Sequence, residues 1–101
     1  MIRRVVKLTF QEDKTDDFIQ VFMDSKDKIV RSKGCHSVDL LQHKNQSNIF
    51  FTYSFWESEE DLNNYRHSDL FQATWKKTKA MFSDKPEAWS TVFISGASSP
   101  K

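Results

Sequence analysis

The sequence contains few of the residues that many cofactor and metal sites require. Its 101 residues include one cysteine, two glycines and two prolines. A single cysteine, Cys35, excludes a disulfide within the chain and any metal site built from several thiolates. With Gly34 and Gly96 as the only glycines, no glycine-rich loop is available to cradle the phosphates of a nucleotide or a flavin. We therefore expect neither a metal nor a cofactor.

Net charge and long apolar runs are also lacking. The 15 Lys and Arg residues nearly balance the 14 Asp and Glu residues, which leaves a net charge of +1 and no block of like charge. Without a basic footprint, nucleic acid is not an expected partner. No apolar run approaches the roughly 18 residues of a membrane span, and the N-terminus lacks the apolar stretch of a signal peptide. The sequence predicts a soluble, cytoplasmic protein with no membrane partner.

Aromatic residues, in contrast, are abundant. The chain has 9 Phe, 3 Trp and 2 Tyr. A single domain of this length has a thin core and buries only about two thirds of its unfolded surface. Some of the aromatic area should therefore line a pocket or a subunit interface. We assign residues 1–95 to one domain and residues 96–101 to a flexible C-terminal tail.

Hydrophobic periodicity divides the first part of the chain into a strand and a helix. Residues 2–10 alternate with period two, which is typical of a strand. Asp13 or Thr15 is a candidate N-cap for the following helix, and Gly34 is suited to end it. The apolar stripe of this helix has the spacing of three and four residues expected of one buried face. Its members are Phe18, Ile19, Phe22, Ile29 and Val30.

The central segment predicts two further strands, and the second one is apolar on both faces. Residues 35–43 have an extended pattern, and residues 49–56 form the clearest strand of the chain. One of its faces would carry Ile49, Phe51, Tyr53 and Phe55. The other would carry Phe50, Thr52, Ser54 and Trp56. An antiparallel sheet with helices on one side is usually polar on the other, so packing of two sheets in a homodimer is the expected cover.

A second helical region and a last strand complete the pattern. Ser58 and Ser68 are both suited to begin helices, so this region should be broken near His67. Residues 88–94 read as the final strand. The resulting order, β-α-β-β-α-β, predicts an α+β, ferredoxin-like fold in which helices cover one face of a four-stranded antiparallel sheet.

One family resemblance covers nearly the whole chain, about residues 3–94. It is carried by Phe-Trp-Glu-Ser-Glu-Glu-Asp-Leu at residues 55–62, by Tyr65, by Ser-Asp-Leu-Phe at residues 68–71, and by Gly-Cys-His at residues 34–36. These motifs resemble the antibiotic biosynthesis monooxygenase family. The resemblance implies a dimeric α/β barrel with a pocket in each subunit between sheet and helices. It also implies oxidation of quinol-like or polycyclic aromatics by O2 without a prosthetic group, or haem degradation in one subgroup.

Candidate site residues follow from what such an oxidation needs. The protein must position a flat aromatic substrate, supply a base or hydrogen-bond donor, and exclude water. A Tyr on a short helix usually keeps its hydroxyl accessible, and an imidazole at a helix break could act as a base near neutral pH. We predict catalytic roles for Tyr65, Trp75 and His67, and substrate binding by Trp56, Phe71 and Phe22.

Two alternatives remain open. The haem-degrading members use an Asn, a Trp and a His where this sequence has Val6, Tyr65 and Trp75, so haem binding or degradation is disfavoured because the axial His is absent. Aromatics at strand and helix spacing are also typical of a packed core. The histidines that other members carry are missing here, which leaves a non-catalytic dimeric barrel that binds a small molecule as the second alternative. Cys35 and His36 should not form a catalytic pair, since neighbours on a strand point to opposite faces.

Overall fold

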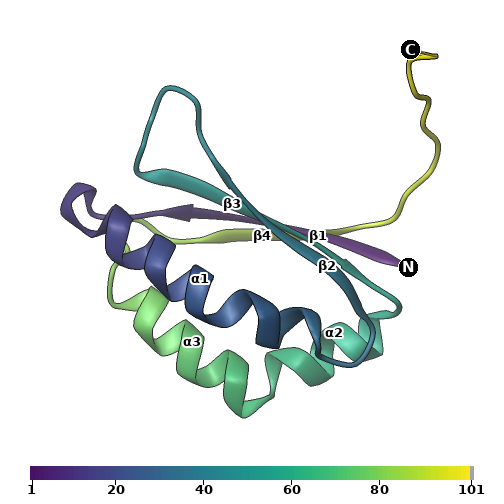
Figure 1. The fold of residues 1–101 in the computed structure, drawn as a ribbon, viewed down its shortest axis with the longest axis horizontal. Coiled ribbons are helices and arrows are strands. Elements are labelled where there is room, and N and C mark those ends of the chain that lie inside the picture. The colour runs from purple at the N-terminus through teal and green to yellow at the C-terminus, as the bar shows by residue number, and fades with distance from the viewer. Residues whose placement is uncertain (101) are drawn as a thin grey trace.

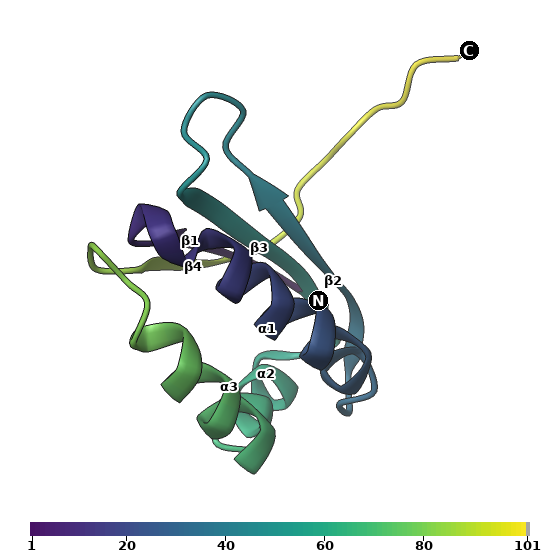
Figure 2. The same ribbon diagram turned by 60° about the vertical axis from the view of Figure 1, so that its left-hand side comes forward.

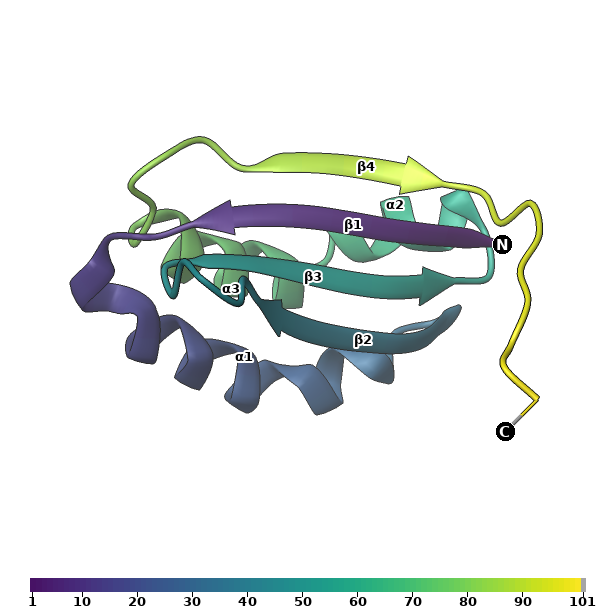
Figure 3. The ribbon, with the colours of Figure 1, turned by 90° about the horizontal axis from the view of Figure 1, so that it is seen from above.

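The computed structural model describes residues 1–100 and contains a four-stranded antiparallel sheet covered by helices on one face (Figure 1). Its elements are β1 (Ile2–Thr9), a short 3-10 helix (Glu12–Lys14), α1 (Thr15–Val30), β2 (Cys35–Gln42), β3 (Ile49–Trp56), α2 (Glu59–Arg66), α3 (Asp69–Lys79) and β4 (Glu87–Thr91). The strands lie side by side in the order β2-β3-β1-β4 (Figure 3). This confirms the predicted ferredoxin-like βαββαβ fold.

The layers follow from the alternation of side chains along the strands. Even-numbered residues of β1 and β3 point toward the helices, and the largest fully buried side chains are Phe10, Phe50 and Trp56. Phe18 from α1 packs between the first two, with ring centroids 4.2 Å from Phe10 and 5.4 Å from Phe50. Figure 2 shows α1 and α3 lying together beneath the sheet, with α2 beside one end. None of the described helices is long and apolar enough to cross a bilayer.

The starts of α2 and α3 agree with the predicted serine caps. The Asp61 amide donates to Ser58 Oγ at 3.1 Å, and the Phe71 amide donates to Ser68 Oγ at 3.1 Å. The predicted capping of α1 by Asp13 or Thr15 is wrong. The 3-10 helix occupies this turn, and Lys14 stands at the N-cap position without a side-chain cap.

The last strand is shorter than predicted. It was expected over residues 88–94 but ends at Thr91, which pairs with Arg3 of β1. Only Met1 and Ile2 precede Arg3 in the sequence. The residues beyond Thr91 therefore have almost no part of β1 left to pair with. The apolar residues that follow are exposed instead, with 54% of Phe93 and 89% of Ile94 accessible.

The face of the sheet opposite the helices carries the odd-numbered aromatics, and no helix or strand of the described residues covers it (Figures 1 and 2). Tyr53 and Phe55 lie 5.6 Å apart between ring centroids, and Trp89 is 48% exposed. The Arg3 guanidinium lies 4.3 Å above the centres of both the Phe55 and the Phe93 rings. Both faces of β3 therefore carry aromatic side chains, as predicted. Burial of the open face in a dimer stays a prediction.

Candidate functional site

A cavity of about 340 Å³ lies between the sheet and the helices α1 and α3. This volume falls within the usual range of small-molecule pockets, about 300–1,000 Å³. Its walls come from both layers of the fold. The sheet contributes Val6 and Leu8 from β1 and Thr52 from β3, and α1 contributes Phe22. The site is thus formed by the inner face of β1 and β3, where short and β-branched side chains leave room beneath the helices.

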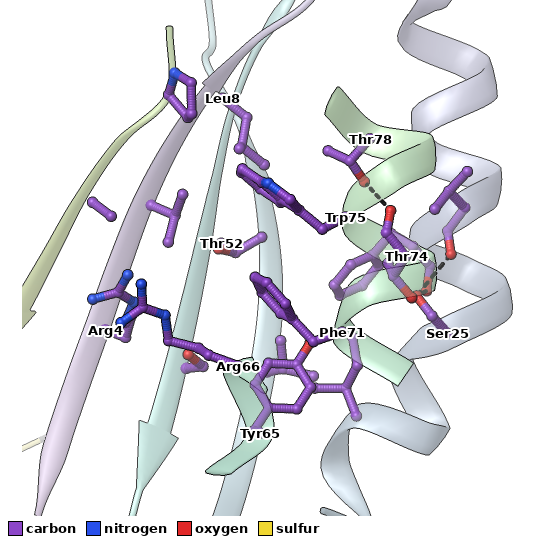
Figure 4. A pocket seen from close by; sticks show the side chains of 18 of the residues that line it. Arg4, Leu8, Ser25, Thr52, Tyr65, Arg66, Phe71, Thr74, Trp75 and Thr78 are labelled. Atoms are coloured by element: carbon purple, nitrogen blue, oxygen red, sulfur yellow. Dashed lines mark hydrogen bonds between the residues drawn. The ribbon is translucent and has the colours of Figure 1, made fainter. Parts of the chain in front are cut away.

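An unbroken series of aromatic rings runs along the helical side of the cavity (Figure 4). The Tyr65 ring stacks on Trp56 with centroids 4.9 Å apart and meets the edge of Phe71 at 5.3 Å. Phe71 in turn lies nearly parallel to Trp75, with an interplanar angle of 13° and centroids 5.7 Å apart. Phe71 and Trp75 are four residues apart on α3 and therefore share one helix face. Such a wall is suited to a flat apolar ligand.

Tyr65 is the neutral hydrogen-bond donor at this wall. Burial, with a smaller contribution from Cys35, raises the pKa of Tyr65 to about 12. The phenol therefore keeps its proton at neutral pH. Its hydroxyl makes no hydrogen bond to any residue that the structure describes, whereas the buried Trp56 indole donates to Ser54 Oγ at 3.0 Å. Tyr65 can thus donate to a ligand, but it is a poor base.

The helices α1 and α3 also bring two hydroxyl groups to the cavity lining, and the protons of both are already used within those helices. Ser25 Oγ donates to the carbonyl oxygen of Val21 at 2.8 Å, and Thr78 Oγ1 donates to that of Thr74 at 2.9 Å (Figure 4). Their oxygens remain able to accept a hydrogen bond. These two groups therefore make the helical lining mildly polar without adding charge.

Two arginines meet at one end of the cavity. Arg4 comes from β1 and Arg66 from the last turn of α2, and both line the cavity (Figure 4). Burial lowers the pKa of Arg4, and the positive charge of Arg66 lowers it further. Neither arginine was a predicted site residue. The sequence pattern that could have indicated Arg4 is its position on the face of β1 that also carries Val6 and Leu8.

The structure brings together most of the residues predicted for the site. Tyr65, Trp75, Trp56, Phe71 and Phe22 all line the cavity. His67 does not: it lies at the C-cap of α2, exposed, and its Nδ1 is 2.7 Å from the carbonyl oxygen of Asn63. The helix break that made His67 a candidate turns its side chain back onto α2, away from the cavity.

Comparison with known protein families then identifies the family of the chain. The family model described as antibiotic biosynthesis monooxygenase matches residues 1–77. The chain belongs to the antibiotic biosynthesis monooxygenase family. No curated protein is similar enough to count as a match.

Solved structures of similar fold include several candidate antibiotic biosynthesis monooxygenases. The one from Nitrosomonas europaea is 15% identical, with a TM-score of 0.87 over 94% of this chain and 100% of its own. The one from Caulobacter crescentus is 21% identical, with a TM-score of 0.86 over 93% of this chain and 90% of its own. A third, from Bordetella bronchiseptica, is 20% identical, with a TM-score of 0.83 over 92% and 96%. At these identities the likeness shows the shared fold.

Within this monooxygenase family fold, the three positions aligned with the haem-degrading members come together. Val6, Tyr65 and Trp75 all line the cavity. Among residues 1–100, no histidine lines it, and no three His, Cys, Asp or Glu side chains gather into a metal site. The cavity therefore offers no imidazole to a haem iron. The pair Cys35 and His36 also lies outside the lining, with His36 Nε2 placed 2.6 Å from Glu57 Oε2.

Proposed function

We propose that this protein is a cofactor-independent monooxygenase that oxidises a quinol-like or polycyclic aromatic molecule with O2. The observation that carries the proposal is the aromatic cavity, with the unpartnered Tyr65 hydroxyl beside the nearly parallel rings of Phe71 and Trp75. Family membership supports the same reaction class. The substrate would be a flat aromatic of the size that about 340 Å³ admits.

The role of the cavity is to hold and polarise a substrate that supplies its own electrons. Phe71 and Trp75 bind the substrate ring by stacking, and Tyr65 donates a hydrogen bond to a substrate oxygen. For an anthrone-like ring, a CH2 group becomes C=O while the second oxygen atom of O2 leaves as water. The substrate gives up all four electrons that O2 accepts, so no other reductant is required. The apolar walls exclude water from the reacting carbon.

Oxygen consumption by the purified protein tests this proposal. Reduced naphthoquinols and anthrones are the substrate panel, and Tyr65→Phe and Trp75→Ala are the cavity variants. We expect turnover of at least one substrate and a loss of about 10²-fold or more in Tyr65→Phe, the scale found when one hydrogen-bond donor to a developing anion is removed. Lys76→Ala, an exposed neighbour of Trp75, should retain full turnover. Equal rates in wild type and both cavity variants would contradict the proposal.

His67 requires its own variant, because its predicted catalytic role depended on a position at the cavity. Its side chain is exposed and contacts the Asn63 carbonyl. Our proposal gives it no part in the reaction, so His67→Ala should turn over the substrate at the wild-type rate. A large loss in this variant would restore the histidine as a base.

A second candidate function is the binding of a small molecule without oxidation. The observation that favours it is the absence of any carboxylate or imidazole among the described lining residues, which leaves no side chain with a pKa suited to a base near pH 7. Mass spectrometry of a ligand extracted from purified protein, before and after exposure to O2, separates the two functions. An unchanged ligand that stays bound favours the binding protein.

We also propose that two copies pack through the open face of the sheet. This face carries Tyr53, Phe55 and the half-exposed Trp89, and large exposed apolar patches are typical of interfaces. Sedimentation equilibrium at micromolar concentration should give a mass of twice 11.9 kDa. A strictly monomeric species would contradict this proposal and leave the aromatic face unexplained.

A further inference from the structure

The strongest unassigned feature is the pair of arginines at one end of the cavity. Arg4 and Arg66 approach from different layers of the fold, and Figure 4 shows both guanidinium groups at the end of the cavity away from Leu8 and Trp75. Within residues 1–100, neither has a carboxylate oxygen within 4.0 Å; the ion pairs formed there are Lys7 with Glu87 and His36 with Glu57. Two positive charges therefore share one site without a counter-charge from the protein.

This arrangement is electrostatically unfavourable unless something else binds there. Among residues 1–100, the one side-chain hydrogen-bond partner of the two guanidinium groups is Ser90, whose neutral Oγ accepts from Arg4 Nη1 at 3.0 Å. A neighbouring like charge and partial burial both disfavour the charged form of a group, and both act on the Arg4 guanidinium. An oxyanion would relieve this cost, because guanidinium N–H groups match the two oxygens of a carboxylate or a single ionised oxygen.

We propose that Arg4 and Arg66 form an oxyanion-binding site that receives a carboxylate or an ionised hydroxyl group carried by a flat aromatic ligand. The ring of this ligand would lie along Tyr65, Phe71 and Trp75, whose rings line the same cavity. The neutral Tyr65 hydroxyl is a further hydrogen-bond donor of the same cavity. The cavity thus has one cationic end and one aromatic wall, which selects an amphiphilic aromatic acid over a neutral hydrocarbon.

The inference concerns the same cavity as the proposed oxidation, but binding does not depend on turnover. If the anion is the ionised hydroxyl of the reacting ring, the arginines also favour the electron-rich form that reacts with O2. If it is a carboxylate, the arginines set the orientation of the ring and the class of substrate. Both sources share the chemistry of an oxyanion on an aromatic ring, and two probes distinguish them.

The first experiment compares 2-naphthoate with 2-naphthamide, which has a similar shape but no charge. Binding is followed without O2 through quenching of tryptophan fluorescence, since Trp56 and Trp75 line the cavity. We expect naphthoate to bind about tenfold or more tightly than the amide. Arg66→Gln and Arg4→Gln should each reduce this preference severalfold, and Arg66→Lys should retain part of it. Arg31→Gln, which neutralises an exposed arginine outside the cavity, should leave the preference unchanged.

The second experiment uses 4-nitro-1-naphthol, whose ionised form absorbs visible light. An ionised hydroxyl held by the arginines should lower the apparent pKa of the bound probe by about one unit, and Arg66→Gln should reverse this shift. A preference for naphthoate with no shift of the nitronaphthol assigns the site to carboxylates; a shift without the preference assigns it to ionised hydroxyls.

The proposal is overturned if neither probe responds to charge, if neither binds at millimolar concentration, or if Arg66→Gln behaves as wild type with both. Arg66 is exposed, so its substitution should not prevent folding. Circular dichroism of each variant verifies this. Failure of the oxygen-consumption assay alone leaves these binding results unaffected, so the two proposals can fail separately.

Discussion

At the scale of single residues, Tyr65 combines the deepest burial of a titratable group in the cavity with a free hydroxyl. Its pKa is raised to about 12, mainly by burial. The folded state therefore holds this proton more tightly than the unfolded chain, whose tyrosines titrate near pH 10. The contribution to stability is complete below about pH 10 and disappears as the pH rises through about 12.

A spectrophotometric titration at the tyrosinate absorption band tests this shift. Wild type should show one tyrosine ionising near pH 12, and Tyr65→Phe should lose that step while Tyr53→Phe keeps it. The unfolding free energy of Tyr65→Phe should fall less steeply between about pH 10 and 12, by up to roughly 2 kcal/mol. A late step that survives in Tyr65→Phe would belong to Tyr53 and would contradict the raised pKa of Tyr65.

At the scale of elements, the junction of α2 and α3 holds the aromatic wall in place. Ser68 Oγ donates to the Tyr65 carbonyl oxygen at 2.6 Å and accepts from the Phe71 amide at 3.1 Å. One hydroxyl therefore ties the end of α2 to the start of α3, at two residues of the wall. Ser58 also caps α2, through the Asp61 amide, but neither Ser58 nor Asp61 lines the cavity.

These two serines form a matched pair of variants. Ser58→Ala and Ser68→Ala should each lower the unfolding free energy by about 1 kcal/mol, the usual cost of a lost N-cap. Only Ser68→Ala should also weaken binding of an aromatic ligand, because it releases Tyr65 and Phe71 together. Chemical denaturation measures the first effect and fluorescence quenching the second. Equal ligand affinity in the two variants would show that the junction does not position the wall.

One glycine, Gly34, fixes the conformation of the turn between α1 and β2. Gly34 has a φ of +81°, and a side-chain carbon there would collide with the Asp61 carboxylate of α2. Gly34→Ala should therefore lower the unfolding free energy by more than the roughly 1–2 kcal/mol of a left-handed residue alone. Gly96→Ala, in the chain beyond β4, should be close to neutral. Thermal denaturation of the two variants makes the comparison, and a smaller loss at Gly34 would mean that α2 moves aside.

At the scale of the whole molecule, β3 separates a core from an open face. Phe50 is 1% exposed and packs against Phe10 and Phe18, with ring centroids 5.8 and 5.4 Å away. Its neighbour Phe51 pairs with Lys7 of β1 on the opposite face. Of these two adjacent phenylalanines, Phe50 therefore belongs to the core of one chain, and Phe51 lies on the open face proposed as the dimer interface.

Alanine at each of these positions separates folding from association. Phe50→Ala should lower the unfolding free energy by about 3–5 kcal/mol at any protein concentration, because it empties the core. Phe51→Ala should weaken the proposed dimer, so that its Tm falls toward that of the diluted wild type and no longer depends on concentration. Denaturation at two concentrations, with sedimentation, measures both. A dimer of unchanged affinity in Phe51→Ala would place the interface elsewhere.

The sequence by itself determined the order of elements, the two serine caps and the left-handed conformation of Gly34. Each of these depends on periodicity or on contacts within a few residues of the chain. The aromatic residues of the cavity were predicted with the help of the family resemblance, because periodicity alone does not distinguish a pocket wall from a packed core. Only the tertiary structure decided the exposure of His67 and the end of β4, which stops where almost no residues of β1 remain to pair with it. The meeting of Arg4 and Arg66 also required it, because strand pairing and helix packing bring distant residues together and local patterns do not record them.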